Sequence, residues 1–267
     1  MDSLTYVMHN HPCYVSDQSR YGRIHLPVAP QCNIKCNYCD QKIGCRYHAF
    51  RPSVATEILS PNDALELVRK YAHNDRLRVV GIAGPGEPLY NENTFKTLEK
   101  IHNAFPDLIL CLSTNGLLLE ESAETLKDLG VKACTITINC VDANIGAKIY
   151  SYVTYKGIKY EGIEGAKLLI EKQLKGLSEI VKQGIVTKIN TILIPGINDM
   201  HIAEIAAEVK KRGAHLQNIT PLIPLASFED IRKPTCSEII DARNACEKII
   251  PQFRHCKQCR ADVIEIV

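Results

Sequence analysis

Tryptophan is absent from this 267-residue chain, and so is any long apolar run. No apolar stretch approaches the roughly 18 residues that a membrane-spanning helix needs. The first ten residues, MDSLTYVMHN, have neither the basic start nor the apolar core of a secretory signal, so we expect a cytoplasmic protein. A large excess of charge of one sign is also lacking. The net charge of +2 argues against nucleic acid as a dominant partner.

Cysteine, by contrast, is abundant, with 12 residues in the chain. The cytosol keeps thiols reduced, so a disulfide framework is not expected in a chain that has no export signal. We therefore interpret the clustered cysteines as metal ligands or redox groups.

Short apolar runs rich in Val, Ile and Thr alternate with helical patterns along most of the chain. The predicted strands are residues 23–28, 78–84, 108–116, 134–139, 186–196 and 218–225. The predicted helices are residues 60–73, 93–105, 118–130, 161–184, 199–213 and 236–250. This alternation implies parallel strands with crossover helices. It favours an α/β fold, a partial (β/α)6 TIM-like barrel, with a doubly wound open sheet as the alternative.

We expect a single domain over residues 1–267. Residues 23–250 would form the partial barrel, with an N-terminal extension at 1–22 and a C-terminal extension at 251–267 that closes the barrel. Both extensions carry cysteines.

The segment QCNIKCNYCD follows the first predicted strand and spaces Cys32, Cys36 and Cys39 as C-x3-C-x2-C. A loop at the carboxyl end of a barrel strand lies where barrel enzymes keep their active sites. Three thiolates suit a [4Fe–4S] cluster that keeps one iron open. The alternative is a zinc loop with a distant fourth ligand.

Glycine and short polar residues end the following strands. The segment GIAGPGEP contains Gly84, Gly86 and Glu87, and glycine lets the backbone approach a ligand closely. Later strand ends contribute Ser113, Thr114, Asn115 and Asn139. Each segment alone could be a turn or a loop cap, but their shared position favours a site.

Two further sets of residues could each hold a cluster by three ligands. One set is Cys13 with Cys256 and Cys259, and the other is His25 with Cys45 and Cys111. His25 is expected to point into the barrel, because its neighbours in the strand should face outward. The alternative for His25 is a hydrogen-bonded core residue.

The remaining cysteines have no partner at ligand spacing. We expect them to be small buried hydrophobic residues. They are Cys134, Cys140, Cys236 and Cys246.

The cysteine triplet, GPGEP and the polar strand ends together resemble the radical S-adenosylmethionine (SAM) enzymes. The resemblance implies that the triplet holds a [4Fe–4S] cluster whose open iron binds SAM, and that the reduced cluster cleaves SAM to a 5′-deoxyadenosyl radical. In GPGEP, Pro85 displaces one glycine of the family's GGEP-like element. The implied SAM site comprises Tyr38, Gly84, Gly86, Glu87, Ser113, Thr114, Asn115, Asn139 and Ile194.

Three more specific segments, HPCY, GPGEP and HCKQCRAD, narrow the resemblance to the NifB family of nitrogenase cofactor biosynthesis. The resemblance runs from about residue 9 to the end, and we expect the short, stand-alone form without a NifX-type domain. It implies that two [4Fe–4S] clusters are fused into an eight-iron cluster with a central carbide. One SAM would donate a methyl group, and a second would supply the radical that removes hydrogen from it.

The resemblance also implies three [4Fe–4S] clusters and a lyase- or transferase-type reaction. His25, Cys45 and Cys111 would hold one substrate cluster, and Cys13, Cys256 and Cys259 the other, with the division between the two sets left open. His11 is a further candidate ligand or proton donor, and Glu87 a further candidate proton carrier.

The expected partners of this monomer are iron–sulfur cluster donors, cofactor carrier or scaffold proteins, and an electron donor such as ferredoxin, but neither nucleic acid nor a membrane. Two alternative functions stay open. One is a radical SAM enzyme whose auxiliary clusters serve the modification of a peptide or RNA. The other is a non-catalytic iron–sulfur scaffold, which would leave GPGEP and the polar strand ends without a role.

Overall fold

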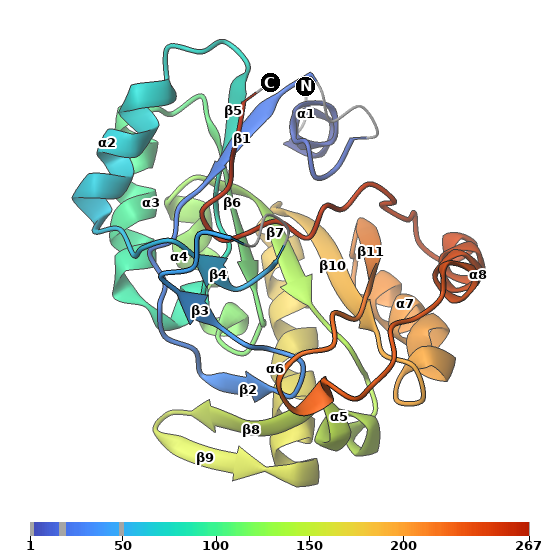
Figure 1. The fold of residues 1–267 in the computed structure, drawn as a ribbon. Helices are drawn as coiled ribbons and strands as arrows, with labels where there is room; N and C mark the ends of the chain where they lie inside the picture. The colour runs from blue at the N-terminus through green and yellow to red at the C-terminus, as the bar shows by residue number, and fades with distance from the viewer. Residues whose placement is uncertain (1–2, 16–19, 48–50, 267) are drawn as a thin grey trace.

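A curled parallel sheet forms the centre of the molecule (Figure 1). The computed structural model describes residues 3–15, 20–47 and 51–266. The main sheet has the strand order β11-β10-β7-β6-β5-β1-β12, in which every pair is parallel except β1 with β12. Its strands are β1 (Gly22–His25), β5 (Leu77–Ile82), β6 (Ile109–Thr114), β7 (Val131–Thr137), β10 (Val186–Leu193), β11 (Leu216–Pro221) and β12 (Ile264–Glu265).

Helices follow the barrel strands and pack on the outer side of the curled sheet (Figure 1). This arrangement confirms the predicted partial (β/α)6 barrel, and the doubly wound sheet is wrong. The helices that follow strands are α2 (Pro61–Tyr71), α3 (Glu92–Ala104), α4 (Leu119–Asp128), α5 (Ala143–Ile149), α6 (Gly162–Lys182), α7 (Ile202–Lys211) and α8 (Cys236–Glu247). Helix α1 (Ser3–Asn10) precedes the barrel, and its Val7 packs with Val79 and Ile109 on the inner face of the sheet instead.

Alternating burial explains why the strands form one core and one cavity. In β1, Ile24 is fully buried in the main apolar core, which the barrel helices cover. Its neighbour His25 points to the opposite face and lines a cavity inside the half-barrel. Side chains alternate between the two faces of a strand, so one strand serves both the core and the cavity.

A second, antiparallel sheet of β2 (Ile34–Cys36), β8 (Tyr150–Tyr155) and β9 (Ile158–Glu161) was not predicted. Its strands are short, and β2 lies more than a hundred residues before its partner β8, so no local pattern announces the pairing. In this sheet Cys36 pairs with Tyr150. The sheet thus fixes the backbone of the cysteine triplet. Strands β3 (Lys42–Ile43) and β4 (Val54–Ala55) form a further, two-stranded sheet.

The C-terminal segment reaches both edges of the half-barrel. Gln252 forms a bridge with Gln217 of β11, and the N–H of Phe253 donates to the carbonyl of Gln217 at 2.7 Å. Farther on, β12 pairs antiparallel with β1 at the other edge. The residues between these two contacts therefore run across the open side of the barrel, and Cys256 and Cys259 lie among them.

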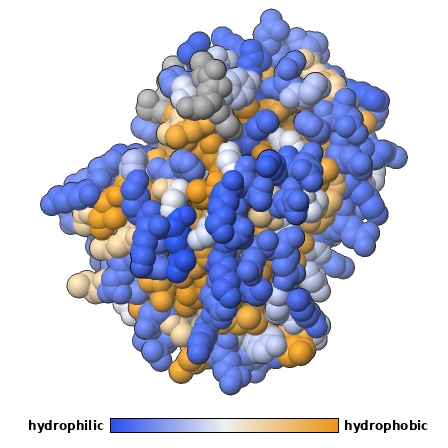
Figure 2. All heavy atoms as spheres, turned by 180° about the vertical axis from the view of Figure 1, so that it is seen from behind, coloured by the Kyte–Doolittle hydropathy of each residue, from blue (hydrophilic) through white to orange (hydrophobic). Residues whose placement is uncertain are grey.

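The face seen from behind is largely hydrophilic, with apolar residues in narrow patches between charged ones (Figure 2). This surface fits amphipathic helices that turn their apolar sides to the sheet, as α6 does with the buried residues Leu169, Ile170 and Leu177. Within the described parts of the chain, no helix combines the length and apolarity needed to cross a membrane.

Candidate functional site

A cavity of about 330 Å³ lies inside the half-barrel. Its wall is built from six barrel strands or the loops that follow them, and from both extensions of the chain. The wall includes most of the residues singled out from the sequence. Among the described residues, four of those candidates lie outside it, namely Cys45, Gly84, Asn139 and Ile194.

The triplet Cys32, Cys36 and Cys39 lines the cavity, and all three thiols are free. The pKa of Cys32 is raised to about 12 and that of Cys36 well above its ordinary value, chiefly by burial. Glu87 contributes to the shift of Cys32, and the neighbouring thiols of the triplet contribute to both shifts. Three neighbouring thiolates would repel one another in the empty site. The positive charge of bound iron would offset this repulsion and keep the cysteines as thiolates. The donor set therefore fits such a group.

No three or more His, Cys, Asp or Glu side chains, within the residues that the structure describes, are grouped to hold one metal ion. A four-iron cluster makes no such demand, because each thiolate binds a different iron.

The GPGEP loop packs on the chain that leads into the triplet. The N–H of Gly86 donates to the carbonyl of Ala29 at 2.6 Å, and the N–H of Glu87 donates to the carbonyl of Gln31 at 2.8 Å. A Cβ on Gly86 would lie 2.2 Å from that Gln31 oxygen. Gly86 is thus required by the close approach of two backbones. Gly84, at φ +116°, allows the turn itself.

Glu87 is buried in the wall, at 3% exposure, and is fully engaged. The hydroxyl of Thr114 donates to it at 2.5 Å, and the N–H groups of Asn115 and Leu89 donate at 2.6 and 3.0 Å. Burial raises its pKa to about 7, although these hydrogen bonds act in the opposite direction. Glu87 therefore joins GPGEP to the STNG loop, and Ser113 lines the same wall.

Tyr38 lines the cavity and is held in place by Asn139, whose side-chain amide donates to the Tyr38 hydroxyl at 2.9 Å. Asn139 is fully buried, and its side-chain oxygen accepts from the N–H of Ile192 at 2.9 Å. Ile194 is also fully buried. Ile192, two residues earlier on β10, lines the wall instead. That Asn139 and Ile194 contact SAM stays a prediction.

His25 of β1 and Cys111 of β6 lie on either side of Gly81, which belongs to β5, the strand between theirs. A Cβ on Gly81 would lie 2.9 Å from the Cys111 sulfur and 3.2 Å from the Cδ2 atom of the His25 ring. The Nδ1 atom of His25 is 3.1 Å from the carbonyl oxygen of Arg260. A carbonyl only accepts, so Nδ1 carries the proton and Nε2 keeps its lone pair.

Burial, with Arg23 nearby, lowers the pKa of His25 to about 4, so the ring is neutral at pH 7. A neutral imidazole with a free Nε2 is the form that binds metal.

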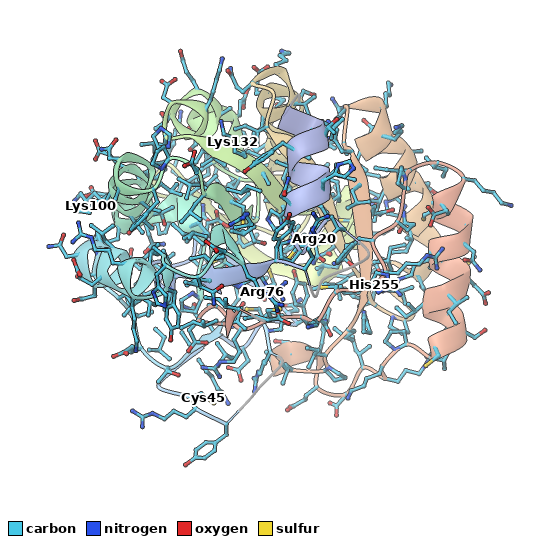
Figure 3. All side chains as sticks on the ribbon, turned by 90° about the horizontal axis from the view of Figure 1, so that it is seen from above. Arg20, Cys45, Arg76, Lys100, Lys132 and His255 are labelled. Atoms are coloured by element: carbon cyan, nitrogen blue, oxygen red, sulfur yellow. The ribbon has the colours of Figure 1, made fainter. Side chains whose placement is uncertain are left out.

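Cys45 lies on the outlying loop at the edge of the molecule, as Figure 3 shows. Its carbonyl accepts a hydrogen bond of 2.8 Å from the guanidinium of Arg260, the residue whose own carbonyl holds His25. Cys45 is thus tied to the same segment as His25, although its side chain lies outside the cavity wall.

The extensions bring Cys13, Cys256 and Cys259 to the cavity wall, although more than 240 residues separate the first from the other two. The guanidinium of Arg23 donates to the Cys259 sulfur at 3.0 Å. Burial raises the pKa of Cys259, and Arg23 acts in the opposite direction.

His11 also reaches this region. Its Nδ1 accepts from the N–H of Cys13 at 3.1 Å, and its buried Nε2 has no hydrogen-bond partner.

Among the wall residues that the sequence reasoning missed are four polar ones on β10 and β11. They are Lys188, Asn190, Asn218 and Thr220, on the inward-facing positions of β10 and β11. The signal was present, because polar residues alternate with apolar ones in KINTI and NIT. The buried Nζ of Lys188 donates to the Cys13 carbonyl at 3.1 Å.

Three of the cysteines expected in the core are buried there, Cys134, Cys140 and Cys246. The prediction for Cys236 was wrong, because this residue is exposed. It is the first residue of α8, where the apolar stripe of the helix has not yet begun.

Residues 26–209 match the model of the radical SAM superfamily. The chain is 44% identical to the "FeMo cofactor biosynthesis protein NifB" of Methanocaldococcus infernus, over all of this chain and 89% of that protein. The chain belongs to the NifB family of radical SAM enzymes. The protein of the same name from Klebsiella pneumoniae is 43% identical over 95% of this chain and 56% of its own length.

Solved structures share the fold at low sequence identity. SuiB of Streptococcus suis has a TM-score of 0.62 and 15% identity, over 86% of this chain and 46% of that one. A radical SAM methyltransferase from Sphaerobacter thermophilus has a TM-score of 0.59 and 17% identity, over 87% of this chain and 64% of that one. These likenesses support the radical SAM barrel. Membership of the superfamily implies a [4Fe–4S] cluster and SAM, which the free triplet and the cavity beside it fit.

Proposed function

We propose that this NifB-family chain builds the eight-iron precursor of the nitrogenase cofactor. It would fuse two [4Fe–4S] clusters and insert a carbide derived from SAM. The observation that carries the proposal is the shared cavity: all of the nine proposed cluster ligands except Cys45 line it. The similarity to proteins named for FeMo cofactor biosynthesis supports the same function.

In this proposal Cys32, Cys36 and Cys39 hold the resident cluster. When bound, this cluster and SAM supply a methyl group and a 5′-deoxyadenosyl radical. Gly86 lets the GPGEP loop pack against the backbone that leads into the triplet, and Glu87 fixes the backbone of the STNG loop so that Ser113 faces the cavity. Tyr38 closes the wall beside the last cysteine of the triplet.

The two substrate clusters would be held on the other parts of the wall. His25 and Cys111 offer one set, which Cys45 completes from the outlying loop. Cys13, Cys256 and Cys259 offer the second set. The neutral imidazole of His25 binds iron less tightly than a thiolate, which suits a cluster that must leave. Each set supplies three ligands, so each cluster would keep an open iron for the fusion.

The partners are part of the proposal: cluster donors, carrier or scaffold proteins of nitrogenase assembly, and an electron donor such as ferredoxin. No second function is favoured, because SuiB, whose structure is also solved with a bound precursor peptide, is only 14% identical in that structure and shows the fold alone. The expected cytoplasmic location and monomeric state stay predictions.

The test is a reconstitution of the full chain with iron, sulfide and dithionite, followed by SAM. We expect 5′-deoxyadenosine to form and the product to activate nitrogenase that lacks its cofactor. A Cys32→Ala/Cys36→Ala/Cys39→Ala variant should form no 5′-deoxyadenosine. The Cys256→Ala/Cys259→Ala variant should still cleave SAM but not activate nitrogenase. If wild-type protein cleaves SAM without ever activating nitrogenase, the proposal is wrong.

A further inference from the structure

Arg23 is a fully buried cation directly behind one of the proposed substrate ligands. Its side chain is 2% exposed, on β1 two residues before His25. Its Nη2 donates to the Cys259 sulfur at 3.0 Å and to a Glu265 oxygen at 2.5 Å. Its Nε is buried without a hydrogen-bond partner. A guanidinium in this position needs nearby negative charge, because burying a lone cation is costly.

Glu265 compensates this charge only in part. The carboxylate is 26% exposed, and its other oxygen also pairs with the ammonium of Lys257. The remaining partner of Arg23 is sulfur. A neutral thiol is a weak acceptor, whereas a thiolate bound to iron keeps negative charge and accepts a charge-assisted hydrogen bond. Arg23 is thus arranged for an anionic, iron-bound Cys259.

Lys188 adds a second buried cation on the facing side. Its side chain is 5% exposed and lies over the rings of Tyr14 and Phe253, while its Nζ donates to the Cys13 carbonyl. Cys13 and Cys259, which come from opposite ends of the chain, are therefore each backed by a buried positive charge. A neutral molecule would not require this arrangement, but a cluster carrying three thiolates is an anion.

We propose that Arg23 is a positioning residue for the substrate cluster held by Cys13, Cys256 and Cys259. Its guanidinium binds the iron-bound Cys259 thiolate and stabilises the more negative, reduced state of the cluster. Hydrogen bonds to cluster sulfur set reduction potentials, so Arg23 raises the potential of this cluster. This inference rests on the proposed function, which supplies the cluster.

The experiment uses the full chain reconstituted with iron and sulfide, without SAM. Reduction potentials are measured by redox titration followed by electron paramagnetic resonance, and iron is counted. The signal of this cluster is the one lost in Cys256→Ala/Cys259→Ala. In Arg23→Gln we expect the signal to remain, with its potential shifted to more negative values. We also expect chelators to remove its iron about tenfold faster, as the loss of one charged hydrogen bond implies.

Glu265→Gln is the matched control, because it breaks the ion pair between β1 and β12 but leaves the guanidinium beside the sulfur. We expect no negative shift in this variant. Equal negative shifts in Arg23→Gln and Glu265→Gln would mean that Arg23 is only a structural anchor. Arg23→Lys keeps the charge but cannot reach both partners, so its shift should be smaller than that of Arg23→Gln. It replaces Arg23→Gln if that variant does not fold.

Two failures are distinguishable. If Cys256→Ala/Cys259→Ala loses no cluster, the proposed substrate site is wrong and this inference falls with it. If that variant loses a cluster but the Arg23 variants leave its potential and iron loss unchanged, only the role of Arg23 is overturned.

Discussion

At the scale of the residue, Glu87 has an unusual position. It is a carboxylate inside the cavity wall, where one hydroxyl and two backbone N–H groups donate to it. Its pKa is raised from 4.5 to about 7 because burial outweighs those hydrogen bonds. The native state therefore holds the Glu87 proton more tightly than the unfolded chain does.

This shift predicts a pH-dependent stability. Between pH 4.5 and about 7 the native state binds more protons, so the free energy of unfolding falls as the pH rises. Over this pH range the free energy of unfolding of the wild type should fall by about 3 kcal/mol more than that of Glu87→Gln, which has no carboxyl group to titrate at this position. Denaturant unfolding of the metal-free, reduced chain between pH 4.5 and 8 measures it. A constant difference between the two proteins across this range would contradict the assignment.

Gly81 gives a second prediction at this scale. In Gly81→Ala the new methyl group would meet the Cys111 sulfur at 2.9 Å and push it away from His25. We expect this variant to lose the iron held by the pair while it keeps its fold. Iron counted after reconstitution measures the loss, and circular dichroism measures the fold. Gly146→Ala is the matched control, because its methyl group meets Ala166 at 2.8 Å away from the cavity. That variant should lose stability but keep its iron. Equal iron in all three proteins would refute the prediction.

At the scale of the element, loops rather than strands shape the SAM side of the cavity. GPGEP touches the chain before the cysteine triplet through two backbone hydrogen bonds, and Glu87 connects it to the STNG loop. The antiparallel sheet then holds Cys36 from the other side. Three loops are therefore coupled, and a change in one displaces the others.

Gly86→Ala tests this coupling. A Cβ at 2.2 Å from a backbone oxygen cannot be accommodated by a side-chain movement, so the loop must shift away from residues 29–31. We expect SAM affinity to fall by about tenfold or more, since the shift breaks at least one buried backbone hydrogen bond. Equilibrium binding of SAM to the reconstituted protein measures this. Unchanged affinity would show that GPGEP does not shape the SAM site.

At the scale of the whole molecule, the C-terminal segment connects the two edges of the half-barrel and supplies two ligands. Ending the chain after Ile250 removes both roles at once. We expect such a chain to lose one substrate cluster and to aggregate, because the edge of β1 becomes unpaired. Cys256→Ala/Cys259→Ala should lose the same cluster without aggregating. Iron counts and light scattering compare them, and a monodisperse truncated chain would contradict the closing role.

Much of this architecture could be predicted from local pattern. The strand near residues 108–116 and the helix near 161–184 follow from periodicity, because side-chain burial repeats with the geometry of each element. The antiparallel sheet could not be predicted in this way, since β2 and β8 are short and far apart in the chain. Lys188 and Asn218 were missed although they alternate with apolar neighbours, because polar residues in a strand can also face solvent.

The sequence by itself determined the chemistry available to this protein. The triplet spacing, the GPGEP glycines and the number of thiols can all be read from the order of the residues without any tertiary contact. Only the tertiary structure decided which donors meet. Cys13 and Cys259 share a cavity wall because both extensions pack on the half-barrel, and Arg23 stands behind that sulfur because β12 pairs with β1. Contacts between distant segments depend on the packing of the whole chain, which no local spacing encodes.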